Sequence, residues 1–177
     1  MATTSLPRPL TCIIVPMVTP LPDIVGLKDS SANMLYFQRL AAMFRERADF
    51  TLLVGPKKLL GQSVLLGGHG GVNGGANLYP RPYVRLYEAA RSRNLARVAA
   101  LQHEVMRISR SLYAVGPSGS SYLRGLKCVL SPLGICNDFL AEPFQPFDPP
   151  ERRLIEQALH NLGVRNGQGG RACPSHN

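Results

Sequence analysis

The sequence predicts an α/β fold, because short apolar runs alternate with segments of helical periodicity. Three runs, at 11–18, 24–27 and 50–54, are apolar and rich in branched residues, as buried strands are. The second and third are each followed by a helical pattern, at 34–47 and 57–66. This alternation is typical of a parallel sheet, and strands that are apolar throughout are typical of sheets covered on both faces.

The helix expected at 34–47 has both a start signal and an apolar face. Ser30, Ser31 and Asn33 offer side-chain oxygens that can cap a helix N-terminus. The apolar residues of this helix are expected on one stripe that faces the sheet. They are Leu35, Phe37, Leu40, Ala41 and Phe44.

The sequence beyond Pro80 is dominated by helical patterns. Apolar residues recur there at helical spacing, with polar residues between them. The predicted helices span 82–91, 95–112, 121–130 and 150–162. The residues that follow the last predicted helix are polar and glycine-rich, so we expect them to form a disordered tail.

Length and composition indicate one ordinary domain. The 177 residues are 45% hydrophobic, which is enough for a core. A complete (β/α)8 barrel needs about 250 residues, so a closed barrel of that type is excluded. The four cysteines form no Cys-x-x-Cys pair, and no apolar run approaches the roughly 18 residues of a membrane span. A reduced, cytoplasmic protein without membrane contact is therefore expected.

The net charge of +9 allows binding to nucleic acid, since basic chains attract polyanions. The arginines, however, are scattered at helical spacings and form no basic run interleaved with aromatic residues. We favour solvated helix faces and expect no nucleic-acid partner. Nucleic-acid binding stays as a third hypothesis behind the two described below.

Lys28 is the candidate for covalent chemistry. It directly follows the apolar run 24–27, at the end of a strand where parallel-sheet enzymes place reactive groups. Apolar neighbours would lower the pKa of its amine and populate the neutral form that attacks carbonyls. A lysine at a strand end is also often simply exposed to solvent, so position alone does not decide between the two.

The segment 67–77 is unusually dense in glycine. Glycines at a strand end let backbone amides approach a ligand closely, and the N-terminus of a following helix favours an anion such as a carboxylate. The alternative is a flexible loop. The spacing fits neither a P-loop nor a dinucleotide fingerprint, so nucleotide binding is not expected.

Several of these segments together resemble the dihydrodipicolinate synthase / N-acetylneuraminate lyase family. The resemblance covers 22–164 and implies about the C-terminal half of a (β/α)8 TIM barrel, followed by a C-terminal helical segment. The matching motifs are IVGLKDSS at 24–31, LLVG at 52–55, GGHGGVNGGANLYP at 67–80, YLRGLKCVLSPLGI at 122–135 and AEPF at 141–144. The implied divisions are a remnant first strand and arm (1–21), a partial barrel (22–91), C-terminal helices (92–164) and the tail (165–177).

The resemblance implies a lyase or aldolase that forms a Schiff base. Lys28 would condense with a 2-keto acid, usually pyruvate, and the imine would act as an electron sink for bond making or breaking with an aldehyde. The resemblance implies no cofactor and no metal. It also implies that the chain forms a homo-oligomer. The positions that match the family's substrate-side residues are Gly55, Val72, Ala76, Asn77 and, at the end of the first strand, Thr19.

The sequence also departs from the family pattern. The strands between the first and the Schiff-base strand are absent, and with them the carboxylate-binding motif and the proton-relay tyrosine. Ala32 stands where the family usually has glycine, and Pro56 and Lys57 replace an acidic pair. The second hypothesis is therefore a non-catalytic remnant or oligomer-interaction module of the family.

The first predicted strand, 11–18, cannot take its family position. A parallel crossover needs about a dozen residues, and the connection 19–23 is too short for one. We expect a hairpin or a detached arm instead.

Overall fold

The computed structural model describes residues 23–113, 115 and 121–162 of the chain. The predicted strand at 11–18, Thr19 and the predicted tail lie outside these ranges. The fold is mixed α/β. Two compact units are present: one ends at Gly74 and also includes Val84–Ala99, and the other comprises Gly75–Tyr83 and the chain from Ala100 on. Within the described ranges, no helix is both long enough and apolar enough to cross a membrane.

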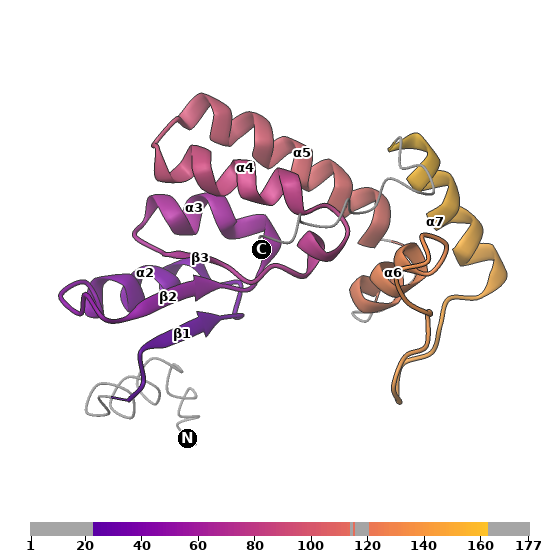
Figure 1. Cartoon of the computed structure of the whole chain (residues 1–177), viewed down its shortest axis with the longest axis horizontal. Helices are drawn as coiled ribbons and strands as arrows, with labels where there is room; N and C mark the ends of the chain where they lie inside the picture. The colour runs from indigo at the N-terminus through magenta and orange to yellow at the C-terminus, as the bar shows by residue number, and fades with distance from the viewer. Residues whose placement is uncertain (1–22, 114, 116–120, 163–177) are drawn as a thin grey trace, which may run out of the picture. The chain divides into compact units, whose positions relative to one another are not determined.

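The first unit contains a three-stranded sheet with the order β1-β2-β3. The strands are β1 (Gly26–Asp29), β2 (Thr51–Val54) and β3 (Gly70–Gly71). Both pairings are parallel, with Lys28 opposite Leu53 and Leu53 opposite Gly70, and Figure 1 shows the strands side by side. The predicted parallel sheet is confirmed.

Helices follow each strand. They are α2 (Met34–Met43), the 3-10 turn η1 (Lys57–Leu59), α3 (Leu60–Leu65), α4 (Pro80–Arg91) and α5 (Leu95–Tyr113). The boundary between the two units falls inside α4 and α5. The Oδ1 atom of Asn33 accepts a hydrogen bond from the Tyr36 N–H at 3.1 Å and so caps α2, as predicted.

The core of the first unit lies between the sheet and the helices. Leu52 and Val54, which alternate along β2, are each 1% exposed, and Phe37 of α2 is fully buried. The opposite face of the sheet carries Lys28, which is exposed, opposite the half-buried Leu53. For the described part of the chain, the prediction that both faces of the strands are covered is therefore wrong.

The predicted apolar stripe of α2 also needs one correction. Phe37, Leu40 and Phe44 are buried, whereas Leu35 is 59% exposed. Leu35 precedes Phe37 by two positions, which places it about 200° around a helix of 3.6 residues per turn. It therefore points away from the core.

The second unit has its own apolar core. Its helices are the later part of α5, α6 (Ser121–Leu130) and α7 (Pro149–Asn161). Gly125 of α6 lies so close to α5 that a Cβ atom there would be 2.3 Å from the Leu112 carbonyl oxygen. The buried core residues are Ile108, Leu112, Cys128, Val129, Phe147, Ile155 and Leu159.

The start of α7 is fixed by a capping box. The Asp148 carboxylate accepts from the Glu151 N–H at 2.8 Å, and the Glu151 carboxylate accepts from the Asp148 N–H at 3.1 Å. Arg124 of α6 donates to the same Glu151 carboxylate at 2.8 Å and lies 4.3 Å over the Phe147 ring. The partly buried ion pair and the cap therefore connect α6 to α7.

Ala32 yields the first testable prediction. Its φ of 59° is in the left-handed region, which costs a residue with a Cβ atom about 1–2 kcal/mol. The Ala32→Gly variant should be more stable than the wild type by about 1 kcal/mol, as measured by urea unfolding. The control Ala42→Gly, at an exposed position of α2, should lose about 1 kcal/mol. Equal losses in both variants would contradict the strain at Ala32.

Candidate functional site

The carboxyl ends of the three strands meet at one edge of the sheet. Asp29 pairs with Val54, and Val54 pairs with Gly71. The Gly55 N–H donates to the Asp29 carbonyl at 2.7 Å, and the Val72 N–H donates to the Val54 carbonyl at 2.9 Å. The structure therefore brings the strand ends that carry Lys28, Gly55 and Val72 to the same edge, where ligands bind in open parallel sheets.

Lys28 reaches this edge on the face of the sheet that the helices do not cover. Side chains alternate between faces along a strand, and Lys28 shares a face with its partner Leu53. The side chain is exposed. Among the described residues, the apolar surroundings expected for Lys28 are therefore not found.

The residues after Lys28 build a fixed turn. Asp29 is only 5% exposed, and its Oδ1 atom accepts from the Ser31 N–H at 2.8 Å. The Ser31 hydroxyl accepts from the Asn33 N–H at 3.1 Å, and this bond leads into the cap of α2. These polar side chains fix the direction in which the chain leaves β1.

Gly55 allows two strand ends to approach each other closely. A Cβ atom at this position would be 2.6 Å from the Ser30 hydroxyl and 3.3 Å from the Asp29 carbonyl oxygen. Asn73 supports the same place, because its side-chain amide donates to the Gly55 carbonyl at 2.9 Å. Sequence reasoning missed Asn73, since an asparagine in a glycine-rich loop gives no signal of burial.

The remaining predicted positions are placed as follows. Val72 directly follows β3 and is 55% exposed. Ala76 and Asn77 lie in the short 3-10 turn η2 (Gly74–Asn77), in the part that belongs to the second unit. Their roles beside the substrate stay predictions, as does that of Thr19.

A second amine, that of Lys57, lies just beyond the end of β2. It begins η1, and its side chain is half-buried. Burial, and then the charge of Lys58, lower the pKa of Lys57 to about 7. A neutral Lys57 amine is therefore accessible near neutral pH. Sequence reasoning noted Lys57 only because Pro56 and Lys57 replace an acidic pair of the family. It missed the lowered pKa of Lys57, because the burial that lowers it comes from the fold.

These observations define a class of protein: a parallel α/β protein with amines and closely approaching glycines at the carboxyl edge of its sheet. Residues 9–162 match the Dihydrodipicolinate synthetase family. The chain therefore belongs to that family.

Individual relatives agree with this membership. The 4-hydroxy-tetrahydrodipicolinate synthase of Bartonella bacilliformis is 30% identical over 80% of this chain and 46% of its own length. The solved dihydrodipicolinate synthase of Bacteroides thetaiotaomicron is 50% identical, with a TM-score of 0.80 over 85% of this chain and 50% of that one. An N-acetylneuraminate lyase from Fusobacterium nucleatum shares the fold, with a TM-score of 0.71 at 14% identity over 90% of this chain and 51% of that one. The chain thus spans about half the length of the relatives it matches.

The lowered pKa of Lys57 predicts a pH-dependent stability. Between pH 7 and about 10.5 the unfolded state binds more protons at Lys57 than the folded state does, so the free energy of unfolding should rise with pH in this window. Below pH 7 both states are protonated and this dependence should level off. The Lys57→Met variant should flatten the rise in urea-unfolding measurements from pH 6.5 to 9.5.

The matched control for this prediction is Lys127→Met, at a half-buried lysine of α6. It should keep the wild-type dependence on pH. A rise of equal slope in Lys57→Met and the wild type would contradict a lowered pKa at Lys57.

Proposed function

We propose that this chain is a lyase of the aldolase type in which Lys28 forms a Schiff base with a 2-keto acid such as pyruvate. The observation that carries the proposal is the amine of Lys28 at the carboxyl edge of β1, beside the strand ends of Gly55 and Val72. Membership of the family supports it. So does a solved family member from Escherichia coli K12, described as a complex with pyruvate.

The proposed reaction begins with attack of the neutral Lys28 amine on the ketone carbon. The carbinolamine that forms loses water and gives an imine. Loss of a proton from the adjacent carbon, or cleavage of a bond there with release of an aldehyde, sends an electron pair into the imine and gives an enamine. In the synthetic direction the enamine returns this pair to the carbonyl carbon of an aldehyde, and water then releases the product from Lys28. Proton transfers accompany each step. Lys57 is a candidate acceptor at the same edge, because a pKa of about 7 suits general acid–base catalysis at neutral pH.

We further propose that the chain forms about the C-terminal half of a (β/α)8 barrel and assembles with a second copy. The Val25 and Asp29 carbonyls accept from β2, at 2.8 and 2.7 Å. The backbone groups of Lys28 between them point to the other edge of β1, which pairs with no strand of the described residues, because alternate residues of a parallel strand face opposite neighbours. A second copy at this edge would remove Lys28 from water and supply surroundings that favour its neutral amine.

The alternative function is a non-catalytic interaction module. The exposure of Lys28 favours it, since a lysine at a strand end is often simply in contact with solvent. The separate core of α5, α6 and α7 also favours it, because none of its buried residues comes from the sheet. A cytoplasmic location belongs to either proposal, and the free thiols of Cys128 and Cys136 support it.

Trapping with pyruvate and borohydride separates the two functions. Reduction of the imine should leave a stable pyruvate adduct on Lys28, located by mass spectrometry of peptides. Lys28→Arg should abolish the adduct, whereas the control Lys127→Arg should keep it at the wild-type rate. Lys57→Arg should still give the adduct on Lys28, but more slowly, because the proposed proton acceptor is lost. A folded wild-type protein without an adduct would refute the Schiff-base proposal, and an adduct on Lys57 alone would refute the role given to Lys28.

The same experiment tests the proposed assembly. If a second copy completes the site, the adduct yield per chain should rise with protein concentration, in step with the dimer fraction seen by native mass spectrometry. A full yield from a monomer would refute the need for a second copy while leaving the chemistry at Lys28 intact.

A further inference from the structure

A cavity of about 570 Å³ lies in the first unit, away from the site of Lys28. It is bordered by the ends of α2 and α3, by the start of β2, by the residues before β3 and by the turn after α4. Its volume falls within the range of pockets that bind small molecules. Every residue of its lining is in the first unit.

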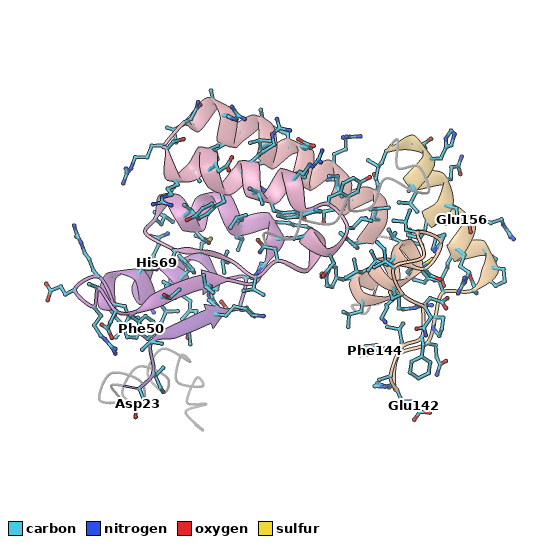
Figure 2. All side chains as sticks on the ribbon, in the orientation of Figure 1. Asp23, Phe50, His69, Glu142, Phe144 and Glu156 are labelled. Carbon is cyan, nitrogen blue, oxygen red and sulfur yellow. The ribbon has the colours of Figure 1, made fainter. Side chains whose placement is uncertain are left out.

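This cavity is at the amino-terminal edge of the sheet. Leu52 lies near the start of β2, and His69 immediately precedes β3. Figure 2 shows His69 and Phe50 at this end of the strands. Because the strands are parallel, Lys28 and Gly55 are at the other edge. The cavity is therefore separate from the proposed Schiff-base site.

The charged side chains of the lining are all basic. They are Arg45, Arg47 and Arg93, His69 lies beside them, and the lining includes no aspartate or glutamate. Arg47 is already engaged, because its Nε atom donates to the Asp49 carboxylate at 3.2 Å and its guanidinium lies 5.3 Å from the Phe50 ring. Arg45 and Arg93 are exposed and supply the charge for a ligand.

The backbone at Arg93 is held in place by two hydrogen bonds. The Arg93 N–H donates to the Ala90 carbonyl at 3.0 Å, and the Asn94 N–H donates to the Ala89 carbonyl at 2.9 Å. This pair of bonds closes α4 in a Schellman motif, with Arg93 at the left-handed position that glycine usually takes. The side chain of Arg93 therefore starts from a fixed point on the rim.

The His69 ring offers its Nε2 atom as a hydrogen-bond donor. Its Nδ1 atom accepts a hydrogen bond from the Leu52 N–H at 3.0 Å. In the neutral ring the proton is consequently on Nε2, which remains able to donate to an anion.

Apolar groups form the rest of the lining. Leu66 is 44% exposed, and the half-buried Leu65 of α3 and alanines of α2 add accessible apolar surface beside it. The buried Phe44 and Leu52 form the floor beneath them. A fully hydrated ion such as free phosphate would leave this apolar surface without a partner. A ligand with an apolar body covers it and still presents its charge to the rim.

We propose that the cavity binds a small amphipathic anion, a molecule with an apolar body and one carboxylate or phosphate group. The competing explanation is that the arginines only complement the carbonyl ends of α2 and α3, as cations near helix C-termini do. That explanation accounts for the charge and predicts no preference for an apolar body.

Calorimetric titration of the full chain tests the proposal with four probes. Phenyl phosphate and phenylacetate each combine an aromatic ring with a negative charge. Inorganic phosphate has the charge without the ring, and benzyl alcohol has the ring without the charge. At least one of the two amphipathic anions should bind more tightly than inorganic phosphate and than benzyl alcohol. Inorganic phosphate binding as tightly as phenyl phosphate, or no binding by either aromatic anion, would overturn the proposal.

Variants assign the binding to this cavity. Arg45→Gln and Arg93→Gln should each weaken the amphipathic anion by about fivefold. Arg93→Gly removes the same charge while relieving the left-handed backbone, so it should stay folded and still lose affinity. The control Arg85→Gln, an exposed change of equal charge on α4, should bind as the wild type does. Equal affinities in all four variants would place the anion elsewhere and refute the site.

Discussion

The parallel pairing of β2 with both of its neighbours is the constraint on which the first unit depends. Thr51 and Gly55 donate to β1, whereas the Leu52 and Val54 carbonyls accept from the chain around β3. This alternation uses both edges of β2 and aligns all three strands in one direction. It also places the carboxyl ends together at one edge and the amino ends at the other, so the unit has two edges of different chemistry.

The two edges differ in their basic residues. The carboxyl edge carries the amines of Lys28 and Lys57, and the amino edge carries the guanidiniums of Arg45 and Arg93. The two amines differ in their surroundings, because Lys57 is half-buried and Lys28 is exposed. The covalent chemistry proposed for Lys28 thus requires a partner that covers the open face of the sheet, whereas the lowered pKa of Lys57 arises within the described fold.

The second unit is stabilised by means that do not involve the sheet. Its helices share an apolar core, and the Asp148–Glu151 capping box is joined to α6 through Arg124. A helical unit of this kind is compatible with catalysis in a completed barrel and with a role in contacts between chains. Family membership is established for a chain that spans about half the length of the relatives it matches.

The sequence by itself determined the order and type of the described α-helices and of β1 and β2, because caps and turns are local, whereas β3 lies in a glycine-rich segment with no strand pattern. Asn33 begins α2, and the prolines after Asp148 begin α7, close to the predicted positions. It also placed Lys28 at a strand end, since the apolar run stops there. Only the tertiary structure decided which side chains are buried. The exposure of Lys28, the burial of Lys57 and the gathering of Arg45 and Arg93 around one cavity depend on segments far apart in the chain, and no local pattern reports such contacts.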